Sequence, residues 1–200
     1  MEDLENLAAQ VVQRIFVELE ASGRHVHVTA QQAQTLFGHS LTPQRPLSQP
    51  GQFLAKERVT VVGPKGEFHD VAVLGPERKE AQVELSLTDG RALGIDLPIR
   101  LSGDIQGSSG AVLLGSQGRV ELTAGAIAAQ RHIHLTPEAA ERFGVRDRQR
   151  VRLKTFTRRP LVFEDVVVRV SPDFAPYAHL DYDEANACGF RKGDLGRILL

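Results

Sequence analysis

The chain has 200 residues, of which 42% are hydrophobic and 24% are charged. This composition is typical of a folded globular protein and excludes a disordered chain or a coiled coil. Its 24 Lys and Arg residues against 25 Asp and Glu residues give a formal net charge of -1. Bulk charge therefore favours neither nucleic acid nor an anionic membrane as a partner.

Membrane insertion, secretion and cysteine chemistry are also disfavoured. No apolar run approaches the roughly 18 residues of a membrane helix, and the acidic start Met1-Glu2-Asp3 lacks the basic segment of a signal peptide. We therefore expect a cytoplasmic protein. The single cysteine, Cys188, excludes an internal disulfide and a cysteine-cluster metal site. A metal would need histidine and carboxylate ligands, so the seven histidines become the residues of interest.

The chain opens with a helical pattern. Between Leu4 and Leu19, apolar residues recur at spacings of three and four, which predicts an amphipathic helix over residues 2–20. We expect its apolar face to pack on the rest of the fold or on a neighbouring subunit, so a homo-oligomer is an open alternative.

Short strands dominate the remaining chain. Alternating or apolar runs are separated by Gly and Pro, which is typical of β-strands; examples are 59–62, 71–74, 83–87, 151–153 and 166–170. Two short helices are expected as well, because capping residues begin them and glycines end them. They run from Thr29 to Gly38 and from Thr136 to Gly144.

An internal repeat organises the chain. Residues 24–29 (RHVHVT) match residues 131–136 (RHIHLT), and residues 68–73 match 163–168 at an offset of 95 residues. A repeat of this length predicts two related structural units, most simply two small β-barrels. The expected domains are a helical segment at 1–21, a first barrel at 22–120 and a second barrel at 121–200, with the active site between the barrels.

The repeated histidines point to metal binding. In a strand, alternate side chains share a face, so His25 and His27 project together, as do His132 and His134. The offset of 95 residues places Glu84 over His179, which supplies each half with a third residue of metal-binding type. We infer two sites, formed by His25, His27 and Glu84 and by His132, His134 and His179.

Three protein ligands leave one coordination position open, as catalytic zinc sites do. The alternative is that the repeated histidines form buried hydrogen-bonded pairs without a metal. His39 and His69 lie outside the repeated histidine pattern and are interpreted as surface residues. Cys188 is interpreted as a small buried residue.

An arginine near an open zinc would suggest an anionic substrate, because the guanidinium matches phosphate or carboxylate in a bidentate way. Arg78 lies six residues before Glu84, and Arg91 and Arg100 also fall nearby; for each, the alternative is a solvated surface charge. The glycine-rich stretch 102–110 is expected to be a connecting loop, with a backbone anion site as the alternative.

From about residue 22 to its end, the chain resembles the PduL-type phosphate propanoyltransferases. The motifs that carry the resemblance, in order, are SGRHVHV (22–28), GPKG (63–66), LGP (74–76) with Arg78, QVELS (82–86), RLSGD (100–104), QRHIH (130–134) and HLDYDEAN (179–186). The resemblance implies two β-barrels with a dinuclear zinc site, and an enzyme that exchanges the coenzyme A of an acyl-CoA for phosphate. It implies the same two ligand sets as the repeat.

Further roles come from the resemblance alone. Arg78 matches the phosphate-binding arginine of the family, and the residues that match its coenzyme A contacts are Ser22, Gly23, Arg24, Lys65 and Asn186. Two departures, Gly23 in place of Asn and Ala72 where a basic residue is common, remove polar contacts expected to coenzyme A.

The resemblance also implies a cellular location. Family members in bacterial microcompartments often carry an N-terminal amphipathic encapsulation peptide, and the helix expected at the start of this chain matches that description. Shell or core proteins of a microcompartment are then its expected partners, beside acyl-CoA and phosphate.

Three functions follow as alternatives. The leading one is a phosphate acyltransferase with two zinc ions, acting on a propanoyl or acetyl group. A zinc-dependent hydrolase or thioesterase would use the same open zinc and arginine. A duplicated β-barrel binding module with structural histidines would have no activity, since a fold alone does not fix function.

Overall fold

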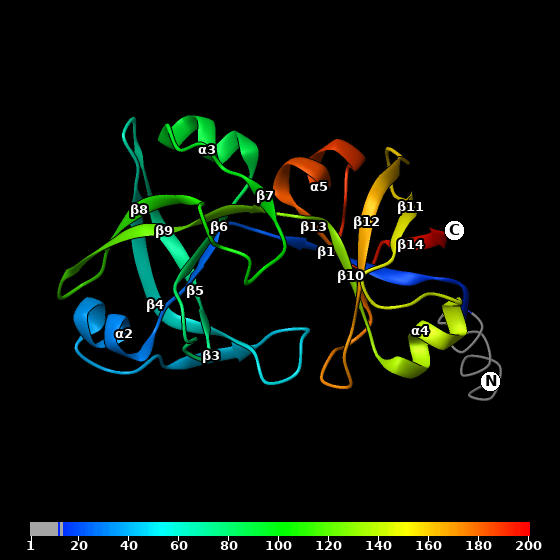
Figure 1. Cartoon of the computed structure of the whole chain (residues 1–200), viewed down its shortest axis with the longest axis horizontal. Coiled ribbons are helices and arrows are strands. Elements are labelled where there is room, and N and C mark those ends of the chain that lie inside the picture. The colour runs from blue at the N-terminus through cyan, green and yellow to red at the C-terminus, as the bar shows by residue number, and fades with distance from the viewer. Residues whose placement is uncertain (1–11, 13) are drawn as a thin grey trace. The chain divides into compact units, whose positions relative to one another are not determined.

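The computed structural model describes residue 12 and residues 14–200 (Figure 1). Over these residues it is mainly β, with four short helices, which confirms the predicted fold class. The strands are β1 (Val17–Ser22), β2 (His25–His27), β3 (Pro43–Pro46), β4 (Phe53–Val62), β5 (Glu67–Gly75), β6 (Gln82–Leu85), β7 (Ile99–Arg100), β8 (Ser109–Leu114), β9 (Arg119–Ala129), β10 (His132–Leu135), β11 (Arg150–Phe156), β12 (Val162–Val170), β13 (Tyr177–Asp181) and β14 (Leu195–Leu199). The helices are α2 (Ala30–Phe37), α3 (Leu87–Leu93), α4 (Pro137–Phe143) and α5 (Tyr182–Cys188).

The chain forms two compact units. We call Gly23–Gln130 the first barrel; the second barrel comprises Arg131–Leu200 together with the residues up to Ser22. In the first, the ring runs β4-β5-β2-β6-β9-β8 and closes on β4, with β3 and β7 added at its edges. In the second, the ring runs β1-β13-β10-β12-β11-β14 and closes on β1.

The two rings have the same strand order and the same orientations. β2 pairs parallel with β5 and antiparallel with β6, just as β10 pairs parallel with β12 and antiparallel with β13. The ring then continues with a parallel pair in each case, β6 with β9 and β13 with β1. The duplication seen in the sequence is thus a duplication of topology.

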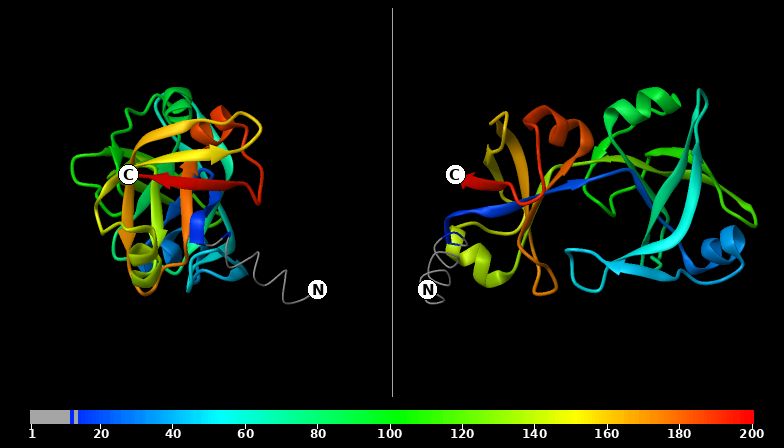
Figure 2. Two further views of the ribbon diagram at one scale, coloured as in Figure 1. Left: turned by 90° about the vertical axis from the view of Figure 1, so that its right-hand side faces the viewer. Right: turned by 180° about the vertical axis from the view of Figure 1, so that it is seen from behind.

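The two repeats exchange their first strands. β1 precedes β2 along the chain but closes the second barrel, on β13 and β14. β9 precedes β10 along the chain but closes the first barrel, on β6 and β8. The units therefore differ from the expected division at residues 120 and 121, because a linear repeat cannot reveal that each half gives its first strand to the other barrel (Figure 2).

The helix predicted over residues 2–20 is wrong at its end. Val17–Ser22 is a strand whose Val17 and Leu19 are buried while Glu18 and Glu20 lie on its other face. Buried and partly exposed side chains therefore alternate, as in a half-buried strand. The same apolar residues also fit spacings of three and four, which is why the sequence predicted a helix. Residues 12, 14 and 15 are helical, and the rest of the predicted helix lies outside the described residues.

The helices begin and end where capping residues dictate. Thr29 and Thr136 cap α2 and α4, and glycines with positive φ, Gly38 and Gly144, end them as predicted. α3 and α5 were not predicted, although each follows a capping box of its own. In the described part of the chain, no helix is long and apolar enough to cross a membrane.

Equivalent bulges mark β5 and β12. Asp70 and Asp165 occupy matching positions and both have positive φ, 55° and 59°. Asp tolerates this left-handed conformation better than most residues, so each can provide the extra residue that shifts the register with β4 or β11. Such detail supports a common origin for the two barrels.

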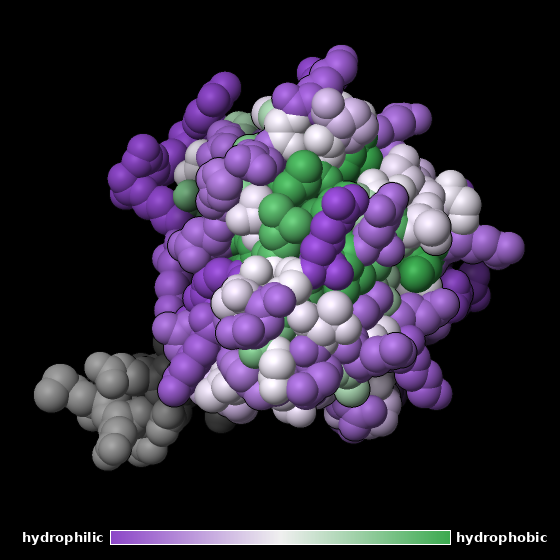
Figure 3. All heavy atoms as spheres, turned by 90° about the vertical axis from the view of Figure 1, so that its left-hand side faces the viewer, coloured by the Kyte–Doolittle hydropathy of each residue, from purple (hydrophilic) through white to green (hydrophobic). Residues whose placement is uncertain are grey.

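Each barrel has its own hydrophobic core. Fully buried members are Val26, Val73, Val83 and Leu113 in the first and Ile133, Leu153, Val168 and Leu180 in the second. Cys188 is buried in the second core, as expected, and burial raises the pKa of its thiol. On the face drawn in Figure 3, hydrophobic residues gather in a central area and hydrophilic residues surround it.

Because β1 completes the second barrel, we expect Leu19→Ala to lower the free energy of unfolding by about 2–5 kcal/mol. Leu19 is 1% exposed, and it packs so closely on β14 that a Cβ at Gly196 would lie 2.8 Å from its Cδ2. Leu161→Ala is the matched control, because Leu161 is 37% exposed in the same barrel, and it should cost about 1 kcal/mol or less. Equal, small losses in urea titrations of both variants would contradict the packing of β1.

Candidate metal centres

The first cluster combines two strands of the first barrel. His25 and His27 share a face of β2, and antiparallel pairing sets Glu84 of β6 opposite His25. The three side chains are buried, and one ligand atom from each lies within 4.8 Å of the others. The structure therefore brings together the three residues that the sequence grouped.

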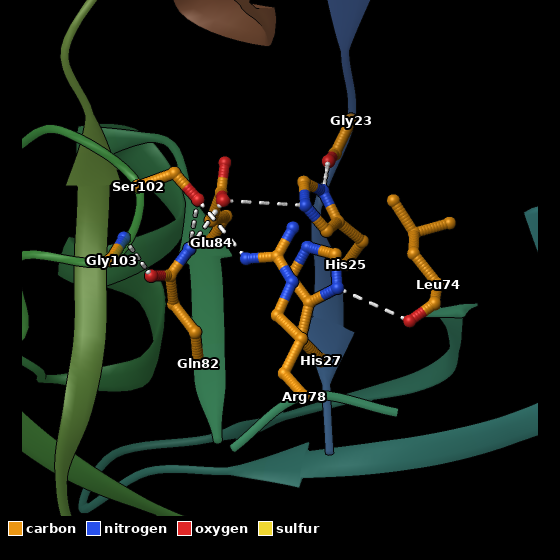
Figure 4. Close-up of polar contacts among 9 residues, drawn as sticks. All are labelled: Gly23, His25, His27, Leu74, Arg78, Gln82, Glu84, Ser102 and Gly103. Carbon is orange, nitrogen blue, oxygen red and sulfur yellow. Dashed lines mark hydrogen bonds and ion pairs between the residues drawn. The ribbon is translucent and has the colours of Figure 1, made fainter. Parts of the chain in front are cut away.

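Hydrogen bonds set the tautomer of both imidazoles (Figure 4). His25 Nδ1 lies 2.8 Å from the carbonyl oxygen of Gly23, and His27 Nδ1 lies 3.1 Å from that of Leu74. A carbonyl can only accept, so Nδ1 carries the hydrogen and Nε2 keeps its lone pair. This arrangement is the usual one for histidines that bind a metal through Nε2.

The electrostatics of the two imidazoles differ. The pKa of His27 is held well below its usual value, first by burial and then by the neighbouring His25 and Arg78. This ring is therefore neutral at neutral pH. Burial also opposes a charge on His25, but Glu84 and the hydrogen bond to the Gly23 carbonyl together outweigh burial and raise the pKa of that ring. His25 Nε2 lies 3.6 Å from Glu84 Oε1, so these two candidate ligand atoms are close enough to bind one cation.

Arg78 and a polar network lie beside this cluster (Figure 4). The Arg78 guanidinium donates to Ser102 Oγ at 3.2 Å, and the Gln82 amide donates to the same oxygen at 2.9 Å. Gln82 also donates to Glu84 Oε1 and accepts from the Gly103 backbone N–H at 2.7 Å. The start of the glycine-rich stretch therefore supports the candidate site.

The sequence reasoning missed Gln82 and Ser102. Gln82 stands two residues before Glu84 in one strand, so the alternation rule already placed both side chains on one face. Ser102 lies in the RLSGD motif, but no local pattern places it beside Gln82, which stands twenty residues earlier in the chain.

The second cluster repeats the first in the second barrel. His132 and His134 lie on β10, and His179 of β13 pairs opposite His132. One ligand atom from each again lies within 4.8 Å of the others, and the ring centroids are 4.6–4.9 Å apart. Phe174 stacks on His134 at 4.0 Å, and His179 Nδ1 lies 3.3 Å from Glu20 Oε2.

Next to each cluster, an arginine pairs with a carboxylate and lies over a phenylalanine ring; we call this arrangement an arginine clamp. Arg24, adjacent to His25, pairs with Asp89 of α3 at 2.8 Å and lies 4.0 Å above the Phe68 ring. Arg131, adjacent to His132, pairs with Glu184 of α5 at 2.7 Å and lies 5.7 Å from the Phe163 ring. Each clamp ties the start of a histidine strand to the helix that follows the third ligand.

The residues matched to coenzyme A contacts are spread over both barrels. Ser22 ends β1 of the second barrel, and Asn186 is exposed on α5 of the same barrel. In the first barrel, Gly23 holds His25 through its carbonyl, Arg24 is partly exposed, and Lys65 is exposed in the turn before β5.

The other candidates lie apart from the clusters. Arg91 is exposed on α3, and Arg100 pairs with Asp104 at 3.8 Å on the surface. His39 and His69 are exposed, as expected.

The donor sets fit a divalent transition metal. Imidazole nitrogens with at most one carboxylate, three to a site, form the ligand set of open zinc sites. In the first cluster the Nδ1 atoms are already held by carbonyls, so the ligand atoms need no rearrangement of tautomer.

Comparison with known proteins identifies the family. The family model described as phosphate propanoyltransferase matches residues 18–191. A phosphate propanoyltransferase of Listeria monocytogenes is 52% identical over 98% of this chain and 93% of its own length. Those of Clostridioides difficile and Enterococcus faecalis are 50% and 51% identical, over 99% and 100% of this chain and 96% and 98% of their own lengths. The resemblance drawn from the motifs is thus confirmed: this chain belongs to the phosphate propanoyltransferase family and is an acyltransferase.

Proposed function

We propose that this chain exchanges coenzyme A and phosphate on a propanoyl group, converting propanoyl-CoA and phosphate to propanoyl phosphate and coenzyme A, with one zinc ion in each cluster. The observation that carries the zinc proposal is the pair of three-ligand clusters at equivalent positions, in which every ligand except the partly exposed His179 is buried. Family membership and the relatives' names support the reaction. Acetyl transfer is chemically the same reaction on a shorter chain.

Zinc at such a site would supply a Lewis acid for the thioester carbonyl and charge compensation for the departing thiolate. Arg78 has the complementary task. Its guanidinium can bind phosphate in a bidentate way, neutralise part of its charge and orient an oxygen for attack on the carbonyl carbon. Gln82 and Ser102 hold Glu84 and Arg78 in place through the network described above. No covalent bond to the protein is needed.

Coenzyme A binding is proposed for the five residues that match the family's contacts: Ser22, Gly23, Arg24, Lys65 and Asn186. Lys65 offers an exposed cationic group suited to the phosphates of the cofactor, and Arg24, which is partly exposed and paired with Asp89, offers a second. We propose that the active site excludes water, since hydrolysis would waste the thioester.

We further propose that the enzyme works inside a bacterial microcompartment in the cytoplasm and that the segment before β1 directs it there. Deleting residues 1–13 leaves β1 in place, so the truncated protein should stay folded and active but no longer enrich in purified shells. Undiminished enrichment would overturn the targeting proposal.

The reaction is tested by thiol release from propanoyl-CoA by the metal-replete protein, with and without phosphate. We expect release only with phosphate, together with formation of propanoyl phosphate. Release without phosphate would identify a thioesterase, and no release from any short acyl-CoA would contradict an acyl-transfer function.

The ligand assignment predicts that His132→Ala loses about one zinc equivalent per chain, because two imidazoles hold zinc far less well than three. His69→Ala is the control, since His69 is an exposed histidine outside both clusters. Inductively coupled plasma mass spectrometry of the purified proteins gives the metal content. Full zinc content in His132→Ala would disprove the assignment.

The role of Arg78 predicts that Arg78→Ala raises the KM for phosphate about 10–100-fold, which corresponds to loss of a charge-assisted contact. Its zinc content should not change. Arg119→Ala is the control, because Arg119 is exposed and pairs with Glu121 in a surface hairpin. An unaltered phosphate dependence in Arg78→Ala would remove this residue from phosphate binding.

A further inference from the structure

Glu20 stands next to the second cluster without belonging to it. β1 runs parallel to β13, and the register sets Glu20 beside His179. The Glu20 Oε2 and His179 Nδ1 atoms are 3.3 Å apart, and the His179 side chain is 12% exposed. A carboxylate from the N-terminal strand thus contacts a proposed metal ligand from the far end of the chain.

This contact sets the tautomer of His179. An ionised carboxylate only accepts, so it favours the hydrogen on Nδ1 and leaves Nε2 as the ligand atom. The carbonyls of Gly23 and Leu74 do the same for His25 and His27. A carboxylate in that place also increases the basicity of the ring and therefore its strength as a ligand.

Comparison of the barrels shows that the partner changes together with the ligand. In the first barrel, Glu84 takes the place of His179, and the residue beside it on the parallel strand is Ile127. A carboxylate ligand has no hydrogen for a carboxylate partner to accept, and two such groups would repel each other. Glu84 instead accepts from the Gln82 amide. An acceptor supports the imidazole ligand, and a donor supports the carboxylate ligand.

We propose that Glu20 is a positioning residue for the second zinc site: it orients His179 and strengthens its bond to the metal. The inference rests on the zinc ions of the proposed function. Because β1 is the strand that closes the second barrel, this support for the metal site is present only when β1 is in place.

The test measures zinc affinity in the full-length protein by competition with a chromogenic chelator. The wild type should hold two zinc equivalents. Glu20→Ala should weaken one of them about 10–100-fold and leave the other unchanged. Glu20→Gln should fall between, since its amide oxygen still accepts a hydrogen bond but carries no charge. Glu18→Gln, on the same face of the same strand, is the matched control and should behave as the wild type.

A second measurement separates positioning from a purely structural role. Thermal unfolding of the metal-free proteins should be alike for wild type and Glu20→Gln, while zinc should raise the midpoint less in the variant. A loss of metal-free stability with two unchanged zinc affinities would overturn the inference.

The outcomes also separate this inference from the proposed function. If the wild type binds two zinc ions and both Glu20 variants bind them equally tightly, the inference fails alone. If the wild type binds none, the zinc proposal fails and the role of Glu20 fails with it.

Discussion

The candidate site depends on the antiparallel pairing of each histidine strand with the strand that follows in the ring. In β2 with β6 and in β10 with β13, this pairing sets the third ligand directly opposite the first histidine. Since side chains alternate faces along a strand, a slip of one residue would replace Glu84 by a buried valine or leucine. Closure of each ring fixes the register, because every strand of the ring is then held by neighbours on both sides.

The same scaffold gives the two clusters different electrostatics. The first has an anionic ligand, Glu84, a nearby cation, Arg78, and a network that reaches Ser102. The second has three imidazoles, an aromatic ring on His134 and a carboxylate behind His179. The second cluster has no anionic ligand, so it would neutralise less of the charge of a divalent metal ion than the first cluster would. The first cluster has the Arg78 guanidinium beside it, which can bind an anion. Duplication followed by such changes yields two unlike sites from one topology.

Much of this arrangement could be predicted from the sequence. The six candidate ligands emerged because the repeat is strong around the histidines and the offset of 95 residues is constant through β5, β6, β12 and β13. β1 was not predicted, because Ile15, Phe16 and Leu19 fit a helical spacing. Only pairing with β13 and β14 makes Val17–Ser22 a strand. The contact of Glu20 with His179 was not predicted for the same reason. The role of Glu20 depends on a strand exchange that no local pattern encodes.

The structure also shows why the repeat is a better guide than any single motif. A lone His-x-His strand is ambiguous. Both barrels, however, have the same strand register, an arginine pair next to the cluster and a matching bulge, at Asp70 or Asp165. The shared register sets the third ligand opposite the first histidine, and each arginine ties the start of a histidine strand to a helix.

The most direct test of this account is anomalous diffraction at the zinc absorption edge from crystals of the full chain grown without chelator. The account predicts two peaks, one bound by the Nε2 atoms of His25 and His27 with Glu84, and one bound by His132, His134 and the Nε2 atom of His179. A single peak, or peaks at other residues, would contradict the claim that the duplicated register builds two metal sites.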